Sequence, residues 1–289
     1  MSLLRTRFEA LLVTILWSSS YVLIAVGLET IPSITFAGLR YGLATLVLVP
    51  FLVLRGHVRT VRQLSVCEWG RFALLGLFLY ALTQGAQFAA LVSLRAATVS
   101  LVLSATPLLV ALSSRVLGES LAPGQWVAVG VVTVGALVYF GPGTLAGAQA
   151  VGLAIMVIGV LSNAGGALVG RAVNASRAYP PLVVTVCSMG IGSVLLLATG
   201  ATVQGMARLT ASEWVIVGWL AVVNTAFAFT LWNRTLRRLS ATESSLINNT
   251  MLVQVALLGW LALGESLSVL EIVGLFVVLA GTLLFQFTE

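Results

Sequence analysis

Long apolar segments recur from one end of this 289-residue chain to the other. Each runs for about 17 to 23 residues, which is long enough to cross a hydrocarbon core of roughly 30 Å as an α-helix. Charged residues make up only 8% of the chain, whereas a water-exposed surface needs roughly a quarter. The connections between the apolar segments are too short for a separate domain. The sequence therefore predicts an all-α membrane protein along its whole length.

The chain contains no Asp and no Lys. A phosphate-binding P-loop requires its Lys, so ATP hydrolysis by that route is excluded. A Lys Schiff base and a paired-Asp protease site are excluded for the same reason. The single His57 and the two cysteines, Cys67 and Cys187, are not spaced as metal ligands. We therefore expect no metal, no cofactor and no enzymatic activity.

All 15 basic residues are Arg, and they are scattered over short connections, which argues against a nucleic-acid partner. The apolar pattern predicts ten helices near residues 8–28, 34–54, 70–91, 96–117, 124–140, 151–171, 179–200, 213–236, 242–263 and 269–287. With the N-terminus inside, only Arg95 and Arg208 fall on the outer side, and Arg40 lies within the second helix. Because Lys and Arg are enriched in cytoplasmic loops, we expect both termini in the cytoplasm.

The sequence repeats itself at equivalent places. Leu-Gly-Glu-Ser-Leu at residues 117–121 recurs at residues 263–267, each time between the last two helices of a half. A shift of 144 positions also matches Thr106 with Thr250. We interpret this as a duplication, with one five-helix repeat in residues 1–145 and another in 146–289. Because five is odd, the second repeat must be inverted in the membrane, an arrangement typical of alternating-access transporters.

Several short segments resemble the ten-helix, EamA-type branch of the drug/metabolite transporter superfamily and, more loosely, YddG-like amino-acid exporters. They are Leu-Trp-Ser-Ser-Ser-Tyr at 16–21, Phe-Ala-Gly-Leu-Arg-Tyr at 36–41, Arg-Ala-Ala-Thr at 95–98 and the two Leu-Gly-Glu junctions. The resemblance implies that helices one to four and six to nine surround a central cavity, with helices five and ten at the periphery. It also implies export across a bacterial inner membrane, but it does not specify the substrate.

One polar stripe lies in the third predicted helix. Tyr80, Gln84 and Gln87 stand at positions i, i+4 and i+7, so they share one face. Polar groups are costly in lipid, and such a face is expected to line a cavity or contact another helix. We take these three residues as candidate substrate-binding residues, with hydrogen bonds to neighbouring helices as the alternative.

The eighth predicted helix combines amide and aromatic groups. Asn224 and Trp232 lie eight positions apart, with Thr225 and Phe229 beside them. Such a face could hold an amphipathic solute, with the amide fixing its polar head and the rings covering its apolar part. Ordinary helix packing with an interfacial Trp is the alternative.

Further candidate binding residues are polar or aromatic side chains within predicted spans. They are Trp17, Ser18 and Tyr21 in the first helix, Asn163 in the sixth, and Asn248 and Asn249 in the ninth. An amide deep in a span needs a hydrogen-bond partner, which could be the substrate or a neighbouring helix.

Three residues are candidates for gating. Pro107 frees a backbone carbonyl in the fourth predicted helix, which could bend the helix or offer an acceptor to the substrate; close packing is the alternative. Glu119 and Glu265 occupy the two repeated junctions, where a carboxylate could instead cap the following helix. No Glu lies clearly at mid-membrane, which weakens proton coupling and leaves facilitated export as a plausible mechanism.

The favoured hypothesis is an inner-membrane secondary transporter that exports small amphipathic metabolites, above all neutral and aromatic amino acids. Efflux of drugs or lipophilic cations is the alternative within transport, and a membrane enzyme or scaffold is the alternative from another class. The expected partners are a small-molecule substrate and the lipid bilayer, with the protein acting as a monomer or a weak homo-oligomer.

Overall fold

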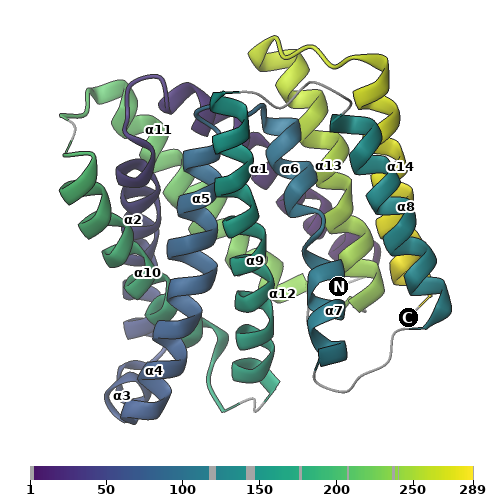
Figure 1. Cartoon of the computed structure of the whole chain (residues 1–289). Helices are drawn as coiled ribbons and strands as arrows, with labels where there is room; N and C mark the ends of the chain where they lie inside the picture. Colours follow the sequence, from purple (N-terminus) through teal and green to yellow (C-terminus); the bar gives the residue numbers. More distant parts are fainter. Residues whose placement is uncertain are drawn as a thin grey trace.

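The chain folds into a bundle of helices joined by short connections (Figure 1). The computed structural model describes residues 3–116, 122–140, 147–175, 178–206, 208–235, 238–239 and 241–288. Within these ranges the structure contains no strand. The helices are α1 (Leu3–Gly27), α2 (Ser33–Leu54), α3 (Val58–Arg62), α4 (Val66–Leu75), η1 (Gly76–Leu82), α5 (Thr83–Ala90), α6 (Ala96–Leu103), α7 (Thr106–Val116), α8 (Pro123–Phe140), α9 (Ala148–Ala175), α10 (Pro181–Val203), α11 (Ala211–Ala221), η2 (Val222–Phe227), α12 (Ala228–Thr235), α13 (Ala241–Leu263) and α14 (Val269–Phe287).

Hydropathy identified the helices well. In the described part of the chain, seven helical segments are long and apolar enough to cross a membrane. Three shorter apolar helices follow the same pattern, at Ala96–Val110, Ile247–Leu263 and Val269–Phe285. The all-helical prediction is therefore confirmed, whereas ten crossings stay a prediction.

The helix predicted over residues 96–117 is interrupted. It is divided into α6 and α7 just before Pro107, which has no N–H to donate to the carbonyl of Leu103. The hydroxyl of Thr106 donates to that carbonyl instead, at 2.7 Å. The carbonyl freed by the proline at the end of α6 thus has a partner in the first residue of α7.

Two long helices each contain a π-helical segment in the middle. One consists of α4, η1 and α5, and the other of α11, η2 and α12. Each begins with a capping box, formed by Ser65 with Glu68 in the first and by Thr210 with Glu213 in the second. The caps are 145 positions apart, and η1 and η2 begin 146 positions apart. The two helices therefore share an unusual local structure at matching places in the two halves of the chain.

The helices α2 and α10 pack against each other in antiparallel directions. Gly200 approaches Thr35 so closely that a side chain would not fit, and Gly190 lies opposite Thr45 further along. Residue numbers rise on one helix as they fall on the other, which defines the antiparallel pairing. Gln204 completes the contact by donating to the hydroxyl of Ser33 at 3.2 Å.

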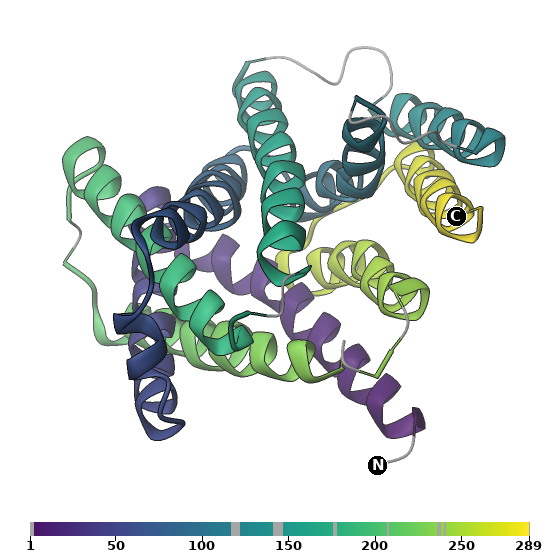
Figure 2. The ribbon, with the colours of Figure 1, turned by 90° about the horizontal axis from the view of Figure 1, so that it is seen from below.

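The helices α8 and α14 form a second antiparallel pair. Gly135 lies against the backbone of Val278, and Gly281 lies against the backbone of Val132. Small residues permit this close approach of helices, which strengthens packing in a membrane. The pair lies at one edge of the bundle, and α2 and α10 lie at the opposite edge (Figure 1, Figure 2).

The helices between these pairs contact one another in matching ways. Helix α1 packs against α12 and α13, and α9 packs in the same manner against α5, α6 and α7. Likewise η2 and α11 contact α2, and η1 and α4 contact α10. These contacts of one half are thus matched by contacts of helices at corresponding places in the other half.

Candidate functional site

The most unusual side chain of the bundle is Arg40, in the first half of α2. It is only 3% exposed. Its Nε donates to the hydroxyl of Thr225 in η2 at 2.9 Å. The guanidinium also lies 5.2 Å from the ring centre of Tyr41 and 5.9 Å from that of Phe88. Aromatic faces and a hydroxyl thus surround a positive charge where α2 meets η2.

No acidic side chain pairs with Arg40 in the part of the chain that the structure describes. The ion pairs that are described lie near helix ends instead. Glu9 pairs with Arg5 and Arg234, and Glu271 pairs with Arg95. The charge of Arg40 is therefore held by hydrogen bonding and by ring contacts.

The polar stripe of the third predicted helix lies beside this arginine. The hydroxyl of Tyr41 donates to Oε1 of Gln84 at 2.6 Å, and its ring lies 5.6 Å from that of Tyr80. Gln87 is also buried. The predicted stripe therefore faces the helix bundle, and Tyr41 connects two of its members with Arg40.

The aromatic candidates of the first and eighth predicted helices meet. The ring of Trp17 lies 5.1 Å from Phe229 and 5.3 Å from Trp232. Asn224 donates to the carbonyl of Leu16 and, at 3.1 Å, to the hydroxyl of Ser19. The sequence predicted this aromatic and amide face, and the structure adds α1 as its partner.

Two polar atoms at this contact are enclosed without a hydrogen bond among the described residues. They are the indole Nε1 of Trp17, a donor, and the side-chain Oδ1 of Asn224, an acceptor. A buried polar atom without a partner is destabilising by roughly 1–3 kcal/mol. A polar solute bound beside the aromatic cluster could form hydrogen bonds with both this donor and this acceptor.

Other predicted binding residues have partners on neighbouring helices. Ser18 donates to Oε1 of Gln254 at 2.9 Å, and Gln254 also donates to Thr14 at 3.2 Å and to Thr250 at 2.8 Å. These contacts fasten α1 to α13. For Ser18 this hydrogen bond is an interhelical contact of the kind considered as the alternative to substrate binding, and a role in binding stays a prediction.

Asn163 also has a partner, because its amide donates to the hydroxyl of Thr106 at 3.0 Å and so connects α9 to α7. The two adjacent amides of α13 differ from each other. Asn248 is exposed, whereas the Nδ2 atom of Asn249 is enclosed and unpaired within the described residues. Tyr21 is buried in the central apolar cluster.

The junction carboxylate Glu265 caps a different helix from the one expected. Its Oε1 accepts from the backbone nitrogen of Ala96 at the start of α6, at 2.9 Å. The following helix, α14, is capped by Ser268 and Glu271 instead. The prediction that Glu265 caps the following helix is therefore wrong, because the positive φ of Gly264 turns the chain back after α13. Glu119, its counterpart, lies outside the described residues.

Arg95 strengthens the same junction. It donates to the carbonyl of Ser266 at 2.6 Å and forms an ion pair with Glu271. The start of α6 is thus attached to the turn between α13 and α14 by a charged side chain and by a cap.

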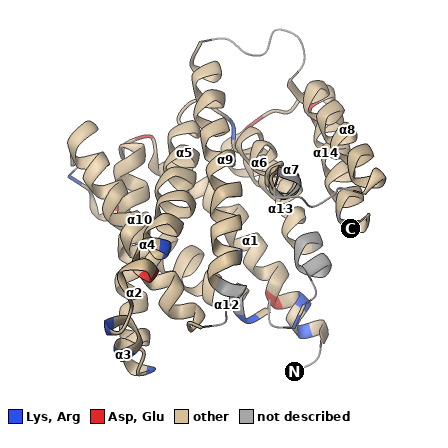
Figure 3. Ribbon diagram, turned by 60° about the horizontal axis from the view of Figure 1, so that its bottom comes forward, with Lys and Arg blue, Asp and Glu red and all other residues tan. Residues whose placement is uncertain are grey.

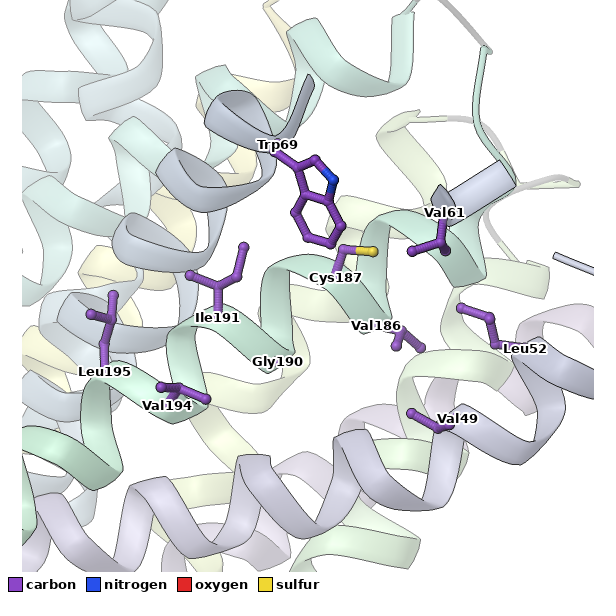
Figure 4. Close-up of a pocket in the computed structure, with 10 residues that line it drawn as sticks. All are labelled: Val49, Leu52, Val61, Trp69, Val186, Cys187, Gly190, Ile191, Val194 and Leu195. Atoms are coloured by element: carbon purple, nitrogen blue, oxygen red, sulfur yellow. The ribbon is translucent and has the colours of Figure 1, made fainter. Parts of the chain in front are cut away.

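A separate pocket of about 490 Å³ lies between α2, α3, α4 and α10 (Figure 4). Trp69 and Cys187 lie near each other in this pocket, and Leu195 lies further along it (Figure 4). Its lining is apolar, and Val194 at its edge is 64% exposed. A pocket without polar groups cannot orient an amphipathic solute, so this space suits a lipid chain better than a transported substrate.

The sequence did not single out Arg40, Tyr41 or Gln254 as site residues. Arg40 and Tyr41 belong to the segment at 36–41 that carried the family resemblance, and Gln254 is a polar residue within a predicted span. The signal for Arg40 was available, since a lone Arg inside an apolar span is costly and suggests a function. Its partner on a helix 185 positions away could not be deduced from spacing.

Long apolar helices with polar groups enclosed between them define a polytopic membrane protein. The model of the EamA-like transporter family matches residues 7–141 and again residues 150–287, and the chain belongs to that family. Membership makes the protein a transporter and not an enzyme.

Relatives agree with this assignment. The "Uncharacterized inner membrane transporter YedA" of Escherichia coli (strain K12) is 29% identical over 284 residues, covering 93% of this chain and 87% of that relative. The "Putative permease-like protein YdzE" of Bacillus subtilis (strain 168) is 39% identical over 66 residues, 23% of this chain and 85% of YdzE. The chain is a multi-pass protein of the inner membrane.

A solved structure described as "Crystal structure of protein" has the same fold. It aligns with a TM-score of 0.65 and 20% sequence identity over 97% of both chains. At this identity the likeness concerns the fold alone.

Proposed function

We propose that this protein is a ten-helix secondary transporter that exports small amphipathic metabolites by alternating access, with neutral and aromatic amino acids as the favoured class. The substrate is held between the two halves of the chain, and α1, α2 and the helix containing η2 provide most of its contacts.

Alternating access in this proposal rests on two inverted repeats, residues 1–145 and 146–289. The support is the match of the family to each half separately and the antiparallel pairing of corresponding helices, α2 with α10 and α8 with α14. A protein built in this way can exchange the conformations of its halves and so open to either side at similar energy.

The proposed orientation has both termini in the cytoplasm. Arginines gather at the end of the bundle that holds α3, the start of α4 and the N-terminus (Figure 3). Such an excess of positive charge is typical of the cytoplasmic side. In this orientation Arg95, Glu265 and Glu271 lie on the outer side, where their contacts act as an outer gate, and the break before Pro107 lets α6 and α7 bend.

The observation that carries the proposed substrate class is the contact of Trp17 with Phe229 and Trp232 beside unpaired polar atoms. Aromatic rings suit an apolar side chain, and the free donor and acceptor suit the polar groups of an amino acid. Efflux of lipophilic cations is the weaker candidate, because the nearby Arg40 has no acidic partner among the described residues and repels cations.

Counterflow in liposomes tests this proposal. The purified protein is reconstituted into liposomes, and the liposomes are loaded with unlabelled solute. The entry of labelled L-phenylalanine, L-leucine or tetraphenylphosphonium is then followed over time. We expect the amino acids to exchange in these liposomes and not in liposomes that lack the protein. Exchange of tetraphenylphosphonium alone would refute the proposed substrate class and favour cation efflux.

A further inference from the structure

We infer that Arg40 binds the anionic group of the transported solute, so that the substrates of this protein carry a carboxylate. The inference rests on the proposed transport site between α1, α2 and η2. It names the chemical group that the site selects.

The first argument is the energy of burying the charge. Moving an isolated guanidinium out of water into a membrane domain is unfavourable by several kcal/mol, and acidic partners usually offset that loss. Arg40 is 3% exposed and has no such partner in the described ranges of the chain. A Leu or Met would fill the same space without the penalty, which points to a role for the charge in binding a ligand.

The second argument concerns the donors that Arg40 leaves free. Its Nε donates to Thr225, but its two terminal nitrogens donate to no described residue. These two nitrogens are not fully enclosed, and they keep some accessible surface. Parallel N–H groups on a planar guanidinium match the two oxygens of a carboxylate.

The third argument is that neighbouring groups complete the site. Tyr21 is 5% exposed and belongs to the same buried cluster as Tyr41, whose ring centre lies 5.2 Å from the Arg40 guanidinium. This phenol is a second donor for an anion. Asn224 directly precedes Thr225 in η2, and its unpaired Oδ1 is an acceptor that suits an ammonium group. Anionic and zwitterionic solutes are therefore favoured over cations.

The position of Thr225 connects binding at Arg40 to helix geometry. Its hydroxyl accepts from Arg40 and donates to the carbonyl of Leu220, five positions earlier, at 2.8 Å. That second bond runs from η2 back to the end of α11, and it holds the hydroxyl in place. Thr225 is thus a positioning residue that fixes the direction of the guanidinium.

The experiment compares ligands that share a phenyl ring but differ in charge. Binding of 3-phenylpropionate, L-phenylalanine, L-phenylalaninamide and 2-phenylethylamine to the purified protein is measured by thermal shift and by competition in counterflow. The variants are Arg40→Gln and Arg40→Lys. Arg55→Gln is the matched control, because Arg55 lies at the exposed end of the same helix.

In the wild type we expect both carboxylates to bind and the amide and the amine to bind much more weakly. Arg40→Gln should weaken binding of the carboxylates by about tenfold or more, as expected for loss of a charged hydrogen bond. Arg40→Lys should restore part of the affinity, and Arg55→Gln should leave it unchanged. Because Arg40→Gln removes an unpaired buried charge, it should not lower the melting temperature.

Three results would overturn the inference: equal wild-type binding of L-phenylalanine and its amide, wild-type affinity of Arg40→Gln for carboxylates, and no binding of any carboxylate. If Arg40→Gln fails to fold, the wild-type comparison of acid with amide decides the question. Arg40-dependent binding of 3-phenylpropionate without any exchange of amino acids would support the inference and refute the proposed amino-acid substrates. Exchange of L-phenylalanine at the same rate by wild type and Arg40→Gln would support the proposed amino-acid substrates and refute the inference about Arg40.

Discussion

The carboxylate of Glu265 accepts a hydrogen bond of 2.9 Å from the backbone nitrogen of Ala96, 169 positions earlier in the chain. A helix that begins in the first half of the protein is therefore capped from the second half. Such a cap is local in its chemistry, but it holds together two distant parts of the sequence.

Replacing Glu265 by Ala should lower the stability of the protein. The change removes the acceptor from the first turn of α6, and loss of an N-terminal cap is destabilising by about 0.5–2 kcal/mol. The measurement is thermal unfolding of the purified protein in detergent. Glu29→Ala is the control, because Glu29 is exposed. An equal melting temperature for both variants would contradict a capping role.

Locking Arg95 to Glu271 should stop transport. The two residues form an ion pair across the proposed outer gate. In a background with Cys67 and Cys187 replaced by Ser, Arg95→Cys with Glu271→Cys is treated with a bifunctional thiol reagent. We expect exchange in liposomes to be lost after cross-linking, and each single Cys variant to retain it. Full activity of the cross-linked protein would show that this contact does not open during transport.

Gln84→Ala should slow transport without lowering the amount of protein in the membrane. The change takes away the acceptor of the Tyr41 hydroxyl and one polar member of the candidate site. The initial rate of counterflow, divided by the amount of reconstituted protein, is the quantity to compare. Gln63→Ala, at an exposed position after α3, should retain the wild-type rate. Unchanged kinetics of Gln84→Ala would remove that residue from the site.

Two glycines of α8 should respond differently to enlargement. Gly135→Leu places a side chain against the backbone of Val278, whereas a Cβ atom added at Gly130 meets nothing within 4 Å. Overpacking a close contact is typically destabilising by about 1–3 kcal/mol. The yield of monodisperse protein in size-exclusion chromatography should fall for Gly135→Leu and stay at the wild-type level for Gly130→Leu. Equal yields would mean that the contact of α8 with α14 does not limit folding.

The sequence predicted the helices because hydrophobicity acts on each segment separately. Lipid solvation requires long apolar runs, so most helix positions followed from hydropathy alone. Helical spacing likewise predicted that Tyr80 and Gln84 share one face of their helix, because that prediction needs only positions within one segment.

Hydropathy and helical spacing could not predict which distant segments contact each other. Ser18 was a candidate for substrate binding, and its hydrogen bond to Gln254 on another helix could not have been deduced from a local pattern. The cap formed by Glu265 was assigned to the wrong helix for the same reason. Arg40 was placed within the second predicted helix but was given no role, although its neighbours make it the central cation of the candidate site.

The π-helical segments have a consequence for deletions. A π turn is equivalent to an α-helix with one residue inserted, and an α-helix advances by about 100° for each residue. Removing one amino acid from Gly76–Leu82 would let the helix continue as an ordinary α-helix and would leave Gln84 and the residues after it facing their present direction. Conversion of the π turn to an α-helix without a deletion would instead rotate them by that angle. The π turn therefore sets the direction of the polar face without changing the hydrophobicity of the span.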